Sequence, residues 1–217
     1  PATLEGRALH NVQNAMFAVA TTYSMGFGLE DIRLGLKTFD TTYFQAPGRM
    51  NICNEHPFKV ILDYGHNPHA VETMSALAGR IDVAGRRIVV LAAPGDRRDE
   101  DVAEIARVTA GAFDHYVCRE DDSRRGREPG AIPLLLKQSL LASGVAESQI
   151  DVIPDEVEAV AHALASAEEG DLLLVFGDEI NRTWKQIVEF DSAGQRPGTD
   201  GAGASLPSLD ALPRGKR

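Results

Sequence analysis

Residues 58–68 read Phe-Lys-Val-Ile-Leu-Asp-Tyr-Gly-His-Asn-Pro. In this stretch an apolar run typical of a buried strand passes directly into a polar turn, and the turn ends at a proline. Pro68 suits the first position of a helix because its missing N–H has no partner there. Open α/β sheets bind their ligands at the carboxyl ends of the strands, so we expect Asp63, His66 and Asn67 to lie at a binding edge.

The same alternation of strand and helix continues towards the C-terminus. Apolar strand-like runs lie at 58–63, 87–92, 114–118, 150–153 and 171–176. Segments with helical periodicity lie near 68–80, 99–112, 131–143, 155–168 and 179–190. This spacing predicts crossover connections between parallel strands. We therefore expect an α/β fold, with a Rossmann-like, mostly parallel sheet and helices on both faces.

Two segments lie outside the alternation and suggest how the chain is divided. Helical patterns over 10–24 and 29–39 come before it, and we predict that residues 1–46 are the helical end of a preceding domain. The α/β domain is predicted over 47–190. Residues 191–217 are rich in Ser, Gly, Pro and Ala and show little periodicity, so we expect a disordered tail.

Composition limits the kind of protein this can be. The apolar content of 43% is enough for a packed core, and the net charge of −10 argues against nucleic acid as the main partner. Cys53 and Cys118 are too few for a disulfide framework, and two lone thiols favour a reducing, cytoplasmic location. No apolar run is long enough to span a bilayer and no signal peptide is visible, so we expect no membrane contact.

Familiar nucleotide-binding and hydrolase motifs are missing from the sequence. There is no G-x-x-x-x-G-K-[ST] phosphate loop, no G-x-G-x-x-G fingerprint, no H-E-x-x-H or C-x-x-C, and no G-x-S-x-G. This chain therefore lacks the usual means of holding a triphosphate by itself.

Polar residues ahead of the α/β unit are candidates for ligand binding. Asn11 and Asn14 lie three apart at the start of a predicted helix, so their side chains share one face. Paired carboxamides can read an adenine edge or a ribose, and the structural alternative is N-capping by Asn11 with an ordinary polar face. Arg49 follows Pro47-Gly48 in a turn, where its planar fork suits a phosphate; the alternative is a solvated arginine.

The turn after the first long apolar run offers three further candidates. Asp63 ends that run, and a carboxylate so placed is costly unless ribose hydroxyls or a cation bind it. His66 and Asn67 follow, and at least one of them could instead cap the next helix.

Acidic residues follow two other predicted strands. Asp96 and Asp99 come after the second long run, and Asp178 and Glu179 after the last. Because the carboxyl ends of parallel strands share one edge, these side chains could converge and hold an ammonium or guanidinium group. Asp99 also fits the first turn of a helix, where the dipole favours negative charge. We interpret the mixed-charge segment 119–127 as a solvated loop rather than a contact for a charged polymer.

Three motifs in this order resemble the Mur ligase family, which includes the peptidoglycan-precursor amino-acid ligases and folylpolyglutamate synthetase. They are HNVQNA at 10–15, APGRM at 46–50 and DYGHNP at 63–68. Longer segments are similar to the cyanophycin synthetase branch over residues 5–190. These segments are TFDTTYFQAPGRMN, EHPFKVILDYGHNP, LAAPGDRRDED, FDHYVCREDD and LVFGDEINRTWKQI.

The resemblance implies an ATP-dependent amide ligase, in which a carboxylate becomes an acyl phosphate that an amine attacks. In the cyanophycin branch, arginine is joined to the β-carboxylates of a poly-aspartate chain, giving cyanophycin. ATP and Mg²⁺ would be held mainly by an upstream central domain, in an enzyme expected to be a homo-oligomer. The missing phosphate loop and the start at Pro1 favour an excised piece over a degenerate relative. We expect no turnover by the piece alone, because phosphoryl transfer needs a positioned triphosphate and metal.

The motifs also imply roles for individual residues. Asn11 and Asn14 would contact the nucleotide, Arg49 its phosphates or ribose, and Asp63 the ribose. Asn67 would complete the nucleotide-binding turn. The catalytic set would be Arg49, Asp63 and His66.

The arginine site follows from the physical argument above rather than from the motifs. Its guanidinium would suit Asp96, Asp99, Asp178 or Glu179. Gly65 stands where many relatives have Ala, a change that we expect to permit the same turn. Two alternatives stay open: a Mur-type ligase that extends a γ-glutamyl chain, and a non-catalytic α/β module that binds a cationic amino acid or polymer without nucleotide.

Overall fold

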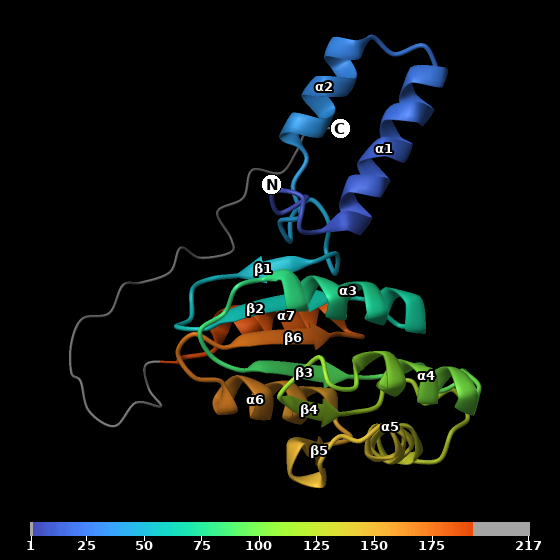
Figure 1. Ribbon diagram of the computed structural model, residues 1–217, viewed down its shortest axis with the longest axis vertical. Helices are drawn as coiled ribbons and strands as arrows, with labels where there is room; N and C mark the ends of the chain where they lie inside the picture. Colours follow the sequence, from blue (N-terminus) through green and yellow to red (C-terminus); the bar gives the residue numbers. More distant parts are fainter. Residues whose placement is uncertain (1, 193–217) are drawn as a thin grey trace, which may run out of the picture.

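The computed structural model describes residues 2–192. Helices α1 (Leu9–Ser24) and α2 (Leu29–Thr38) form a hairpin that stands away from a layered α/β body (Figure 1). Both helices lie within one residue of their predicted positions at each end. The predicted tail, apart from Asp191 and Ser192, lies outside the described residues, and the predicted domain boundaries stay predictions.

The α/β body is built on a six-stranded sheet with the order β1-β2-β6-β3-β4-β5. Strand β1 runs antiparallel to β2, and every other neighbouring pair is parallel, which confirms the mostly parallel sheet. The strands are β1 (Asn51–Cys53), β2 (Lys59–Asp63), β3 (Arg87–Leu91), β4 (His115–Cys118), β5 (Ile150–Val152) and β6 (Leu172–Phe176).

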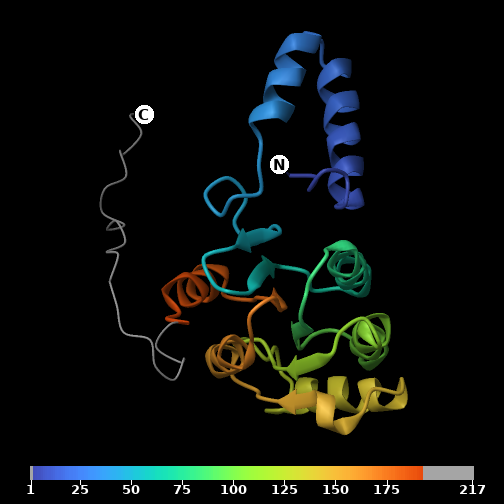
Figure 2. The same cartoon turned by 60° about the vertical axis from the view of Figure 1, so that its left-hand side comes forward.

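Helices cover both faces of this sheet, as predicted. Figure 2 shows α3 and α4 (green) on one side and α6 and α7 (orange and red) on the other. Side chains of the central strand β6 alternate between two cores: Leu172, Leu174 and Phe176 pack on the first face, and Leu173 and Val175 on the second. The helices are α3 (Pro68–Arg80), α4 (Asp99–Thr109), α5 (Ala131–Ala142), α6 (Glu156–Ser166) and α7 (Ile180–Glu189), with a 3₁₀ turn η1 (Glu147–Gln149) before β5.

The hairpin differs from the α/β body in how little of it is covered. Neither α1 nor α2 contains a buried residue. Large apolar side chains on and beside them are exposed, among them Phe17, Met25, Leu29, Leu34 and Phe39. Within residues 2–192, no helix is both long enough and apolar enough to cross a membrane.

Gly65 lies in the turn after β2, against a buried ring. A Cβ atom at this position would lie 2.8 Å from Cε1 of Phe176 and 3.2 Å from Oδ1 of Asp63. The Phe176 side chain is buried in the core and has little freedom to retreat. Glycine fits this turn as expected, and an alanine here would require the Phe176 ring or the turn to shift.

We predict that Gly65→Ala lowers the free energy of unfolding by about 1–3 kcal/mol, the usual cost of overpacking a core. Gly79 on α3 provides the matched control, because nothing lies within 4 Å of a Cβ atom built there. Gly79→Ala should leave stability unchanged or raise it by up to about 1 kcal/mol, since alanine favours a helix. Urea unfolding followed by circular dichroism measures both, and equal effects would show that Phe176 yields without cost.

Candidate functional site

A cavity of about 890 Å³ lies between the helical hairpin and the start of the α/β body. Four of the predicted nucleotide-binding residues line it: Asn11, Asn14, Arg49 and Asp63. They come from α1, from the turn before β1 and from the carboxyl end of β2, and the fold brings them to one space. His66 and Asn67 are not among the residues that line it.

Asn11 and Asn14 form a hydrogen bond with each other and do not cap the N-terminus of α1. Asn14 Nδ2 donates to Asn11 Oδ1 at 3.3 Å, and Asn11 Nδ2 donates to the carbonyl of Ala2 at 2.8 Å. The N-cap of α1 is Ala8, which makes no side-chain cap bond, so the capping alternative for Asn11 is wrong. Within residues 2–192, Asn14 Oδ1 accepts no hydrogen bond, which leaves this oxygen available to a ligand in the cavity.

Asp63 is held by the backbone at the edge of the same cavity. Its side chain is nearly buried, and Oδ2 accepts from the backbone N–H of Met50 at 3.0 Å. Burial raises the pKa of Asp63, against the opposing effect of the Met50 and Gly65 N–H groups and of the Arg49 and His66 charges. Met50 has a left-handed φ of 52°, which is uncommon for a residue other than glycine. A strained residue thus aims its N–H at the carboxylate, an arrangement typical of functional sites.

The other two residues of this turn have local structural partners. Asn67 Oδ1 accepts from Ala70 N at 3.0 Å and caps α3, with Pro68 at the first helical position. His66 Nδ1 lies 3.0 Å from the carbonyl oxygen of Tyr64, and His66 is among the residues that line a second, smaller cavity. The structural alternative therefore holds for Asn67, and its nucleotide role stays a prediction.

The second cavity, of about 80 Å³, lies where the parallel strands end. Asp178 lines it, together with Asp121 and three arginines. One of these, Arg97, was not predicted: its Nε is buried and has no partner in the described part of the chain. Nothing in the mixed-charge sequence around it distinguishes Arg97 from its solvated neighbours.

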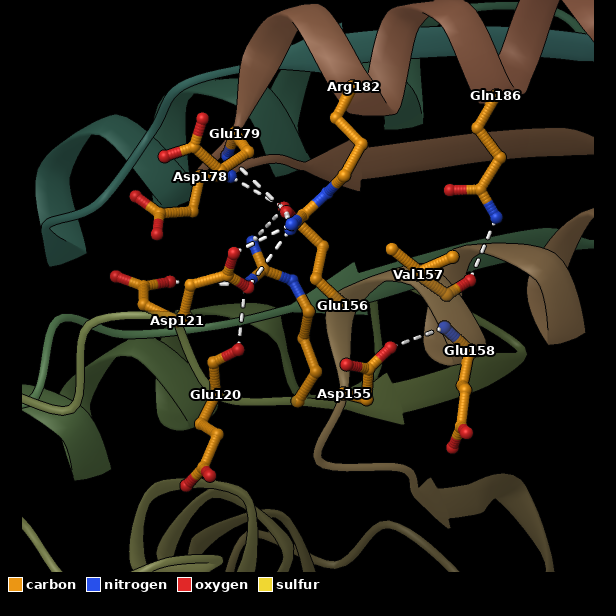
Figure 3. Close-up of polar contacts among 12 residues, drawn as sticks. Glu120, Asp121, Asp155, Glu156, Val157, Glu158, Asp178, Glu179, Arg182 and Gln186 are labelled. Atoms are coloured by element: carbon orange, nitrogen blue, oxygen red, sulfur yellow. Dashed lines mark hydrogen bonds and ion pairs between the residues drawn. The ribbon is translucent and has the colours of Figure 1, made fainter.

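Two of the four acidic residues predicted to hold a guanidinium are already paired with arginines of the chain itself. Asp96 Oδ1 pairs with Arg125 Nη1 at 3.0 Å, and Asp99 Oδ1 pairs with Arg127 Nη1 at 2.6 Å. Asp99 also opens α4, which agrees with its structural alternative. By contrast, the carboxylates of Asp178 and Glu179 form no hydrogen bond or ion pair with residues 2–192, and Figure 3 shows both turned away from Glu156.

A buried ion-pair network lies next to the turn that carries Asp178 and Glu179 (Figure 3). Arg119 is 1% exposed and pairs with Glu156 at 3.0 Å and with Asp121 at 3.1 Å. The interpretation of 119–127 as a solvated loop is therefore wrong for Arg119 and Asp121. Burial raises the pKa of Asp121, although the Arg119 charge opposes the shift. An arginine placed directly after an apolar strand was the only sign of this network in the sequence.

Glu156 connects the network to the Asp178 turn. Its carboxylate accepts the backbone N–H groups of Asp178 at 2.7 Å and Glu179 at 3.3 Å. Arg182 on α7 pairs with Glu156 on one side and with Asp122 at 2.6 Å on the other. The backbone of the turn is thus fixed while its two carboxylates stay available.

Residues 48–178 match the family described as Mur ligase, glutamate ligase domain. The chain is 34% identical over 182 residues to the cyanophycin synthetase of Crocosphaera subtropica, covering 84% of this chain and 20% of that protein. It is 28% identical to the UDP-N-acetylmuramoyl-L-alanyl-D-glutamate–2,6-diaminopimelate ligase of Geobacillus kaustophilus, covering 83% of this chain and 36% of the other. This chain therefore spans about a fifth of the length of the cyanophycin synthetases it matches.

Solved structures agree on the fold. Escherichia coli FolC, in complex with DHPP and ADP, is 24% identical with a TM-score of 0.62, covering 81% of this chain and 38% of that one. MurC of Thermotoga maritima, a UDP-N-acetylmuramate-alanine ligase, has a TM-score of 0.59 at 22% identity, covering 82% of this chain and 37% of the other. With a family match over more than half its length and the fold of these ligases, the chain belongs to the Mur ligase family.

Proposed function

We propose that this chain is the C-terminal part of an ATP-dependent amide ligase of the cyanophycin synthetase type, which adds arginine to the β-carboxylates of poly-aspartate. The observation that carries the proposal is the first cavity. Residues singled out in three separate motifs, Asn11, Asn14, Arg49 and Asp63, line one space large enough for a nucleotide. The similarity to cyanophycin synthetases over most of the chain supports the same function.

The side chains around that cavity fit an adenosine nucleotide. The free carboxamide oxygen of Asn14 suits the edge of a base, and Arg49 supplies a planar cation for phosphate. The carboxylate of Asp63 suits a ribose hydroxyl. ATP would supply the phosphoryl group that activates the acceptor carboxylate, with Mg²⁺ and the triphosphate held by residues outside these 217.

The second cavity and the turn beside it are the proposed place for the incoming amino acid. Asp178 and Glu179 present carboxylates without an ion-pair partner in the described residues, which suits a guanidinium. Arg97 presents a cation with no hydrogen-bond or ion-pair partner there, which suits the carboxylate of an amino acid. Because Arg97 would also suit a glutamate side chain, the γ-glutamyl ligase stays the second candidate.

We propose that the apolar hairpin packs against the upstream part of the same enzyme. Its exposed apolar side chains, which include Phe17 and Phe39, would be covered there. We further propose that the complete enzyme is a homo-oligomer. On this proposal the 217-residue chain alone has no turnover.

The experiment uses the complete reading frame that contains this chain, with whatever is encoded upstream of Pro1. Phosphate release from ATP and Mg²⁺ is measured with a poly-aspartate primer and either L-arginine or L-glutamate. We expect release that depends on arginine, and kcat/KM about 10- to 100-fold lower in Arg49→Ala, the loss for one hydrogen bond to a charged group.

Glu158→Gln is the matched control, because this exposed side chain on α6 lies outside both cavities. Its kcat/KM should equal that of the wild type. Release that depends on glutamate would favour the γ-glutamyl ligase. Arginine binding that is indifferent to ATP would favour the non-catalytic module.

A further inference from the structure

Two histidines and an aspartate meet on the α6 side of the sheet. His115 begins β4, Asp151 lies in the edge strand β5, and His162 lies on α6. His115 Nε2 and His162 Nε2 each lie 2.8 Å from the same atom, Oδ2 of Asp151. These three residues line neither the first nor the second cavity and have no role in the proposed ligase chemistry.

The register of the strands explains how the three side chains meet. Asp151 pairs with Val117, two residues after His115, and alternate residues of a strand point to the same face. Val117 packs into the core beneath α6, so His115 and Asp151 face that helix. Cys118 points to the opposite face of the sheet, and burial, together with the Asp151 charge, raises the pKa of its thiol to about 12.

The arrangement has the chemistry of a metal site. The two imidazole nitrogens and the carboxylate oxygen all lie within 4.8 Å of one another. The side chains of His115, Asp151 and His162 are 23%, 39% and 44% exposed, so an ion and its water ligands can reach them.

We propose that His115, Asp151 and His162 bind one divalent transition-metal ion of the zinc type, with at least one coordination position left to water. Imidazole nitrogens select zinc and its neighbours over magnesium, which prefers oxygen ligands. The ion would be distinct from the Mg²⁺ of phosphoryl transfer. The bound ion would connect the edge strand β5 to helix α6. Its ligand His162 lies about 9 Å along the helix axis from Glu156, the first residue of α6.

The experiment uses the 217-residue chain after chelator treatment, titrated with ZnCl₂ in competition with a chromophoric zinc chelator. We expect one equivalent of Zn²⁺ with a Kd in the micromolar range or below, and no comparable binding of MgCl₂. Asp151→Asn and His162→Gln should each weaken Zn²⁺ binding at least about tenfold, since even indirect ligand partners contribute that much. His69→Gln is the matched control, because His69 is an exposed histidine on α3.

Two further measurements keep the result decisive if a variant fails to fold, which circular dichroism detects. On the wild-type chain, Zn²⁺ should shift the imidazole NMR signals of His115 and His162 and leave those of His69 in place. CoCl₂ should give visible absorption typical of four-coordinate cobalt. Absence of saturable Zn²⁺ binding by the folded chain, or binding that is equal in all variants, would overturn the proposal and leave the cluster as a hydrogen-bonded clamp.

Discussion

Glu156→Ala is expected to lower the free energy of unfolding by about 3–5 kcal/mol, the cost of removing one partner of a buried ion pair. The Glu156 carboxylate is completely buried and is shared between Arg119 and Arg182. Its loss leaves Arg119, which is 1% exposed, with Asp121 as its remaining carboxylate. Two backbone N–H groups, of Asp178 and Glu179, lose their acceptor at the same time.

Urea unfolding of the 217-residue chain measures this loss, and Glu158→Ala is the matched control. Glu158 lies two residues further along α6 and is exposed. Its contact with Asp155 is made by its backbone N–H, which donates to Asp155 Oδ1 at 2.9 Å, and not by its side chain (Figure 3). Its replacement should change stability by less than about 0.5 kcal/mol, as is usual on a surface. Similar losses for both variants would mean that the network contributes little beyond helix propensity.

The parts of the fold that the sequence predicts are those governed by local patterns. Apolar runs identified the long strands, and helical periodicity placed α1 and α2 to within one residue at each end. The cap at Asn67 was the structural alternative for the polar turn before Pro68. Each of these features depends on neighbours within a few residues, where propensity and periodicity act.

The contacts that lie outside such patterns join distant segments. Arg119, Glu156 and Arg182 follow or lie on three different elements, and their charges alone suggest a solvated surface. Similarly, Asp96 is separated from Arg125 by a helix and a strand, so the pairing that occupies its carboxylate was not visible in the sequence. The chain order places Asp96 and Asp178 after parallel strands, but only the tertiary structure shows which of the two carboxylates has no ion-pair partner within the described residues.

The acidic candidates for the proposed amino-acid site differ in whether their carboxylates already have an arginine partner within the chain. The carboxylates of Asp96 and Asp99 already hold arginines of the protein itself. Asp178 lines the second cavity and forms no ion pair within residues 2–192, while its backbone is fixed by Glu156. A substrate guanidinium would therefore find a positioned carboxylate at Asp178, and at Asp96 it would have to displace Arg125.

Asp178→Asn in the complete enzyme is therefore expected to raise the KM for arginine about 10- to 100-fold, the worth of a hydrogen bond to a charged group, with a smaller change in kcat. The N–H of residue 178 still donates to Glu156 in this variant, so unfolding by urea should change little. Asp96→Asn is the comparison, because it removes a carboxylate that Arg125 already occupies, and its KM for arginine should rise less. An unchanged KM for arginine in Asp178→Asn, with phosphate release still dependent on arginine, would move the guanidinium elsewhere without affecting the ligase proposal. A gain in glutamate-dependent phosphate release would instead support the γ-glutamyl ligase. Without the negative charge of Asp178, Arg97 could attract the side-chain carboxylate of glutamate as well as its α-carboxylate.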